Sequence, residues 1–181
     1  MRAFVAIPFP EPLGEKLAAY AADALAGLDG RVVPAQNLHA TVHFLGAVDD
    51  TDAEPLQAAV ATACASVTAF SLRLAGAALA PPSRPRMIWA QLEAPPELAE
   101  LARAVAAAAE PFAPGARPPR TGKPHLTLAR LRRPPPRGTG LPPLPAAGAE
   151  IDVAACTLVR SELGRGGARH TPLATLPLRK R

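Results

Sequence analysis

A strand that begins with His-x-Thr occurs once in each half of the chain, and this repeat limits the possible folds more than any other feature of the sequence. The first copy is Leu38-His39-Ala40-Thr41-Val42 and the second is Pro124-His125-Leu126-Thr127-Leu128. Because successive side chains of a strand point to opposite faces, His39 and Thr41 share one face, as do His125 and Thr127. If the two strands lie side by side, two imidazoles and two hydroxyls converge on one point.

The rest of the sequence predicts an α+β fold. Residues 11–28, 51–67 and 97–110 repeat apolar side chains at helical spacing. Strands are expected at residues 3–7, 38–45, 70–77, 86–92, 125–131, 151–160 and 173–178. Because helices and strands do not alternate regularly along the chain, this order fits an α+β fold better than a regular parallel sheet.

The net charge and the cysteines indicate which class of partner the protein binds and in which cellular compartment it is expected. The formal net charge of +5 favours an anionic partner such as RNA or DNA. Cys64 and Cys156 have neither metal-binding nor disulfide spacing, so we expect a reducing cytoplasm. The N-terminus does not resemble a signal peptide, and no apolar run approaches the roughly 20 residues that span a bilayer, so no membrane segment is expected.

The two histidines predict phosphoryl transfer without a metal. In-line displacement at phosphorus needs a base for the attacking oxygen and an acid for the leaving oxygen, and imidazole titrates near neutral pH. The hydroxyls of Thr41 and Thr127 can donate hydrogen bonds to the phosphate oxygens, and Arg130 can offset their charge. Arg130 stands five residues after His125, so on an unbroken strand it points away from the motif; a bulge or the strand end must redirect it.

Two other uses of the same residues remain open. Each His-x-Thr can be a half-buried strand whose histidine binds a backbone group and whose threonine is present for its β propensity. Alternatively His39, His43 and His125 can bind zinc, although no Asp, Glu or Cys stands beside either motif to complete such a site. We therefore expect neither a metal nor a cofactor.

The other aromatic residues and histidines are expected to play no part in the chemistry. His43 is expected at a solvated strand position and His170 in an exposed, glycine-rich turn, while Phe44 and Trp89 are expected in the core. The sequence has no Gly-x-Ser-x-Gly elbow, Walker A loop or Gly-x-Gly-x-x-Gly fingerprint, which disfavours acyl transfer, nucleotide triphosphate hydrolysis and dinucleotide binding.

Several segments together resemble the 2H phosphoesterase superfamily, and within it the bacterial and archaeal RNA 2',3'-cyclic phosphodiesterases, also called 2'-5' RNA ligases, LigT or ThpR proteins. The segments are Arg2-Ala3-Phe4-Val5-Ala6-Ile7, Asn37-Leu38-His39-Ala40-Thr41-Val42 followed by Phe44-Leu45-Gly46, Pro124-His125-Leu126-Thr127-Leu128-Ala129-Arg130, and Leu158-Val159-Arg160-Ser161-Glu162-Leu163. The resemblance covers almost the whole chain.

The resemblance implies one domain over residues 1–181 with two pseudo-symmetric lobes, two antiparallel-rich sheets, helices on the outer faces and a central cleft. It implies hydrolysis of RNA 2',3'-cyclic phosphate ends, with His39 as proton donor, His125 as proton acceptor, and Thr41, Thr127 and Arg130 on the phosphate. A 2'-phosphate product, weak reverse 2'-5' ligation, tRNA fragments among the substrates and a monomeric protein are further expectations. A small cyclic phosphate or nucleotide as substrate, and a non-catalytic RNA-binding module, stay open as alternatives. The basic segments 117–123 and 130–137 would contribute nothing to binding if the substrate were a mononucleotide.

Overall fold

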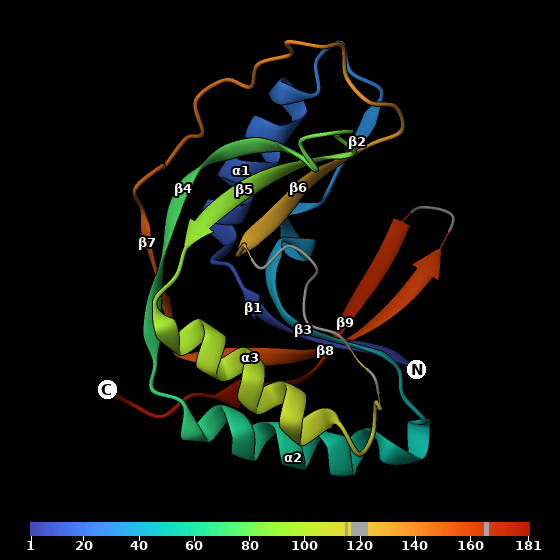
Figure 1. Cartoon of the computed structure of the whole chain (residues 1–181), viewed down its shortest axis with the longest axis vertical. Coiled ribbons are helices and arrows are strands. Elements are labelled where there is room, and N and C mark those ends of the chain that lie inside the picture. Colours follow the sequence, from blue (N-terminus) through green and yellow to red (C-terminus); the bar gives the residue numbers. More distant parts are fainter. Residues whose placement is uncertain (115, 117–122, 165–166) are drawn as a thin grey trace.

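The apolar, strand-forming segments of the sequence build most of the core of the protein, whose computed structural model describes residues 1–114, 116, 123–164 and 167–181. The strands are β1 (Arg2–Pro8), β2 (Gly30–Val32), β3 (His39–Ala47), β4 (Phe70–Ala80), β5 (Met87–Glu93), β6 (His125–Leu131), β7 (Glu150–Val153), β8 (Ala155–Gly164) and β9 (Gly167–Pro177). They form one curved antiparallel sheet in the order β7, β4, β5, β6, β3, β1, β8, β9, with β2 beside β6 (Figure 1). The predicted α+β class is confirmed.

The two motif strands lie next to each other at the centre of this sheet. Their pairing consists of one residue pair, Ala40 opposite Leu126, and beyond it β6 pairs with β2. The sheet therefore divides into two antiparallel halves, one ending in β3 and one in β6, that separate from this junction. The two sheets expected from the sequence are thus two halves of a single sheet.

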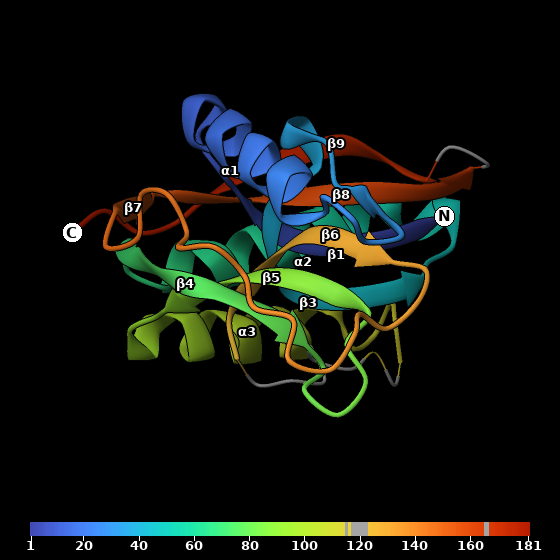
Figure 2. The same cartoon turned by 90° about the horizontal axis from the view of Figure 1, so that it is seen from above.

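In the part of the chain that the structure describes, three α-helices cover the sheet. They are α1 (Glu11–Ala24), α2 (Ala53–Ser66) and α3 (Pro96–Ala109). Helix α1 contacts β6, whereas α3 contacts β3 and packs against α2. Figure 2 shows α1 and α3 on opposite sides of the central strands. Each half of the chain thus supplies a helix that covers the motif strand of the other half.

Burial on the helix-covered face leaves the other face of each motif strand for chemistry. Leu56 and Val60 of α2 and Leu101 and Val105 of α3 are fully buried, and each such side chain contributes about 1.5–3 kcal/mol to folding. In β6, Leu126 and Leu128 are also fully buried, while His125 and Thr127, which alternate with them, are half-buried. The apolar positions of the motif strands therefore fix which face each histidine occupies.

The helices and the motif strands follow the sequence prediction closely, and the C-terminal strands depart from it. Strand β6 has the predicted bounds, and β3 begins at its histidine. Strand β2 was not predicted, and the single strand predicted at residues 151–160 is divided into β7 and β8. Among the described residues, no helix has the length and apolar character needed to cross a membrane.

Candidate active site

One cavity collects every side chain that the sequence predicted for phosphate chemistry. It has a volume of about 430 Å³, and residues of β1, β2, β3, β6, β8 and β9 line it. His39, Thr41, His125, Thr127 and Arg130 all contribute to its wall. The histidine and threonine of each strand lie on the same face, as the alternation of side chains requires.

A β-bulge brings Arg130 into this cavity. On β5, Ile88 pairs with Ala129 and the next residue, Trp89, pairs with Thr127, so one residue of β6 is passed over. Leu128 and Ala129 are consecutive and both fully buried, and Arg130 then emerges on the face of the motif. A bulge re-aims the side chains that follow it, so Arg130 faces the cavity although an unbroken strand would point it away.

The same irregularity occurs in β3 and corrects two expectations. Val5 of β1 pairs with His43 and the next residue, Ala6, pairs with Thr41. His43, which was expected at a solvated position, is only 1% exposed and points into the core. Phe44, which was expected in the core, is 50% exposed and lines the cavity. The repeat in the sequence could have predicted that Phe44 and Arg130 occupy equivalent positions, because Phe44 follows His39 by the same interval as Arg130 follows His125.

The rings of His39 and His125 each form a hydrogen bond with the backbone carbonyl two residues earlier in the sequence. Nδ1 of His39 lies 2.7 Å from the carbonyl oxygen of Asn37, and Nδ1 of His125 lies 2.8 Å from that of Lys123. A carbonyl oxygen can only accept a hydrogen bond, so Nδ1 carries the proton in both rings. Nε2 of each ring is then the atom that accepts or donates a proton in the cavity.

Burial gives both imidazoles a lowered pKa. It lowers the pKa of His39 to about 4, with His170, Arg130 and His125 adding to the effect and the carbonyl of Asn37 opposing it. Burial also lowers the pKa of His125, against the carbonyl of Lys123. His39 is therefore neutral at neutral pH in the protein alone, and a bound anion is needed to favour its charged form.

Aromatic rings fix the plane of each imidazole. The His125 ring stacks on Trp89 with centroids 3.7 Å apart and planes 20° apart. The His39 ring lies 4.8 Å from Phe4 and 5.2 Å from His170, which meets it edge to face. Trp89 is buried as expected, but its contact with His125 was not predicted.

His170 is the residue that the sequence placed least well. It was expected in an exposed turn, whereas it lies within β9, is half-buried and lines the cavity. The strand continues through it because β9 pairs with β8 along its whole length, with His170 opposite Ser161. Nothing in the local sequence around His170 signals this partner strand.

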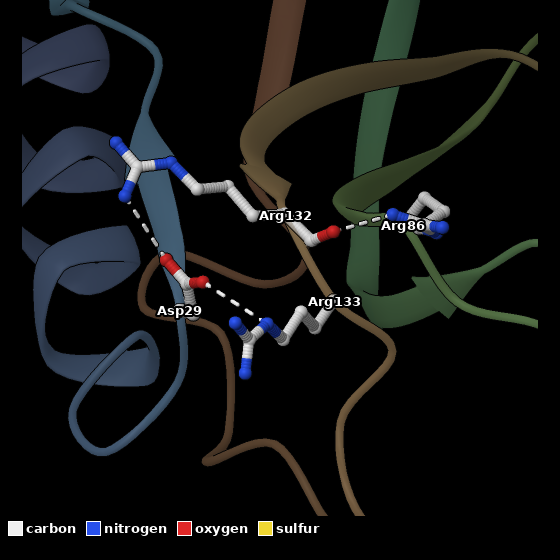
Figure 3. A network of polar contacts seen from close by, with 4 residues as sticks. All are labelled: Asp29, Arg86, Arg132 and Arg133. Carbon is white, nitrogen blue, oxygen red and sulfur yellow. Dashed lines mark hydrogen bonds and ion pairs between the residues drawn. The ribbon is translucent and has the colours of Figure 1, made fainter.

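The basic segment after β6 is partly engaged by an acidic residue (Figure 3). Asp29 lies 3.2 Å from Nη1 of Arg132 and 3.8 Å from Nε of Arg133, and Arg86 donates a hydrogen bond to the carbonyl oxygen of Arg132. These contacts join β2, β5 and β6 at their ends and reduce the positive charge that Arg132 and Arg133 present at the surface. Arg117 and Arg120 of the other predicted basic segment lie outside the described residues.

The predicted zinc alternative needs three histidines that do not meet. His43 points into the core, away from the cavity that contains His39 and His125. Within the described part of the chain, no group of three or more His, Cys, Asp or Glu side chains is placed to hold a metal ion. The geometry therefore supports an imidazole pair and no zinc cluster of these three residues.

Comparisons with known proteins find one family. A family model described as LigT like phosphoesterase matches residues 7–89. The RNA 2',3'-cyclic phosphodiesterase of Escherichia coli strain K12 is 31% identical over 95% of this chain and 93% of its own length. The crystal structure of TT0787 from Thermus thermophilus is 32% identical, with a TM-score of 0.83 over 99% of both chains. The structure of E. coli LigT complexed with 3'-AMP is 30% identical, with a TM-score of 0.79 over 98% of this chain and 97% of that one.

Proposed function

The chain belongs to the LigT-like phosphoesterase family, and from this premise we propose that it hydrolyses the 2',3'-cyclic phosphate ends of RNA to 2'-phosphomonoesters. The observation that carries the proposal is the pair of imidazoles in one cavity, each with Nδ1 bound to a carbonyl. The curated relative from E. coli is named for this activity, and a LigT structure holds a nucleotide.

In the proposed reaction His125 is the base and His39 the acid. Nε2 of His125 takes a proton from water as the water oxygen bonds to phosphorus. The bond from phosphorus to O3' breaks, and Nε2 of His39 gives its proton to O3'. The products are a 2'-phosphate and a 3'-hydroxyl, and a proton returned through solvent from His125 to His39 completes the cycle.

Substrate binding supplies the charge that this cycle needs. Because His39 has a pKa of about 4 in the protein alone, it must gain its proton when the phosphate anion enters. A negative charge near Nε2 favours the imidazolium form. The substrate thus prepares its own acid catalyst, while His125 remains the base.

Thr41, Thr127 and Arg130 complete the proposed site by binding the non-bridging oxygens. The threonine hydroxyls lie beside the two imidazoles on the same strand faces. Charge-assisted hydrogen bonds from Arg130 stabilise the negative charge that grows on these oxygens in the transition state. Because one chain carries all five residues, the proposed chemistry needs no second copy, and the two imidazoles supply the acid and the base that it uses.

Two finer parts of the proposal follow from the same geometry. When the 5'-hydroxyl of another RNA takes the place of water, its oxygen bonds to phosphorus and the bond to O3' breaks, which leaves a 2'-5' linkage and a 3'-hydroxyl; this is the proposed weak 2'-5' ligation. RNA fragments with cyclic phosphate ends, tRNA fragments among them, are the proposed substrates, and a cytoplasmic monomer is the proposed state of the enzyme.

The test is hydrolysis of a short RNA that ends in a 2',3'-cyclic phosphate, in excess EDTA, with the position of the product phosphate determined. A 2'-phosphate formed in EDTA is the expected result. Loss of activity on EDTA addition, or a 3'-phosphate product, would contradict the mechanism. Turnover of a cyclic mononucleotide alone would indicate a small-molecule phosphodiesterase, and RNA binding without turnover would indicate a binding module.

A further inference from the structure

A second arginine, Arg31, faces the same cavity directly opposite Arg130. The two residues are paired across β2 and β6, and both line the cavity. Like charges directly opposite each other on one sheet face are destabilising, so a pair in this position indicates that the face meets negative charge. The described lining of the cavity contains Arg2, Arg31 and Arg130 and no aspartate or glutamate.

The side chain of Arg31 extends from β2 toward the hairpin formed by β8 and β9. A Cβ atom at Gly167 would lie 3.3 Å from Nη1 of Arg31, so the absence of a side chain at Gly167 leaves room for the guanidinium. The next residue, Ala168, accepts a hydrogen bond of 3.3 Å from the side-chain amide of Asn37. The guanidinium of Arg31 therefore lies where the hairpin meets the motif strands.

The guanidinium groups of the two arginines extend toward different strands. Nη1 of Arg130 lies 3.8 Å from Sδ of Met87 on β5, and the charge of Arg130 contributes to the lowered pKa of His39 and His170. Nη1 of Arg31 instead lies beside Gly167 on β9. The cavity therefore presents two guanidiniums that diverge from one residue pair, and two separate anionic groups can meet them.

From this arrangement we infer that Arg31 binds a second phosphate of the substrate, the one on the 5' oxygen of the terminal nucleotide. An RNA end carries such a phosphate as a diester, whereas a free nucleoside 2',3'-cyclic phosphate does not. Arg31 is then a specificity residue that favours RNA ends over mononucleosides. The inference rests on the proposed function and adds to it the class of substrate that the cavity prefers.

The test compares adenosine 2',3'-cyclic phosphate with its 5'-phosphorylated form and with a dinucleotide that ends in the same cyclic phosphate. The wild-type protein is expected to prefer the two substrates that carry a 5' phosphate, through a lower KM. In Arg31→Ala this preference is expected to fall by roughly tenfold, the effect of losing one charge-assisted hydrogen bond. Arg31→Lys keeps the charge and is expected to keep most of the preference.

Arg103→Ala is the matched control. Arg103 is exposed on α3 and does not line the cavity, so its removal changes the net charge equally and leaves the site intact. It is expected to keep the wild-type preference. If Arg103→Ala and Arg31→Ala weaken the preference equally, the effect is one of overall charge and the inference is wrong.

Two further outcomes would overturn the inference, and one belongs to the proposed function instead. Equal losses of kcat/KM on all three substrates in Arg31→Ala would place Arg31 on the reacting phosphate. Unchanged kcat/KM on all three substrates would show that Arg31 does not bind the substrate. Absence of any hydrolysis by the wild type would count against the proposed function. In that case calorimetric binding of adenosine 2',5'-bisphosphate and adenosine 2'-phosphate decides: only an Arg31-dependent advantage of the bisphosphate supports the inference.

Discussion

At the scale of single residues, the proposed chemistry depends on the protonation of two imidazoles. A backbone carbonyl fixes the proton on Nδ1 of His39 and of His125, so each presents Nε2 to the cavity. The two rings differ in their surroundings, because Phe4 and His170 contact His39 while Trp89 stacks on His125. The same hydrogen-bonded form of the side chain therefore serves two environments and, in our account, two roles.

Ligand binding should be accompanied by proton uptake at His39. With a pKa of about 4, His39 is neutral at pH 7.5, and an anion beside Nε2 raises that pKa, so the bound state carries the extra proton. Adenosine 2'-phosphate should bring in up to about one proton more in the wild type than in His39→Gln. Calorimetry in two buffers with different ionisation enthalpies measures this difference, and equal uptake in the two proteins would contradict the role of His39.

Local sequence was a poor guide to the residues around the motif. His43 and Phe44 exchange their expected environments because a bulge in β3 shifts the alternation by one residue. Whether a strand contains a bulge depends on its partner strands, which the strand's own sequence does not specify. The motif residues themselves were predictable, since His39 and Thr41 precede the bulge and keep the simple alternation.

At the scale of elements, the two motif strands have the same design. The burial of β3 from His39 to Leu45 follows the same order as that of β6 from His125 to Leu131. In each strand two consecutive buried residues are followed by a side chain that faces the cavity. The repeated bulge therefore places Phe44 and Arg130 at equivalent positions, one for an apolar contact and one for a charge.

Strand β5 should support catalysis through Trp89, although this residue does not line the cavity. Trp89→Leu removes the ring that stacks on His125, and a contact of this kind is worth about 0.5–1.5 kcal/mol. We expect kcat to fall by up to about tenfold with little change in KM. Trp89→Phe retains a stacking ring and should stay within about threefold of the wild type.

Steady-state kinetics of both Trp89 variants, with thermal unfolding followed by circular dichroism, checks this prediction. An equal loss of kcat in both variants would show that the stacked ring does not orient His125. A loss that follows only the melting temperature would assign Trp89 a structural role alone.

The elements with a clear apolar pattern were predictable, and those that depend on distant partners were not. Strand β6 has the predicted bounds and helix α3 lies within one residue of them, because their apolar side chains face the core. Strand β2 has three residues and pairs with β6 across about a hundred positions of sequence, so its short segment was not predicted. Strand β9 extends past its predicted start because β8 pairs with it throughout.

At the scale of the whole molecule, function depends on how the two halves of the sheet meet. The single pair of Ala40 and Leu126 joins them, and each half supplies one imidazole to the common cavity. The halves are not identical, because His170, Phe4 and Phe44 surround the first motif while Trp89 and Arg130 accompany the second. In the proposed reaction, this asymmetry allows one histidine to act as acid and the other as base.

The most direct measurement is the turnover of a short RNA with a 2',3'-cyclic phosphate end, in EDTA, by His39→Asn, His125→Asn and the double variant. Each single variant should lose roughly 100-fold or more in kcat, the range for one acid or base group. The double variant should lose little more, because acid and base act as one unit. A single variant that keeps the wild-type rate would contradict the two-imidazole account.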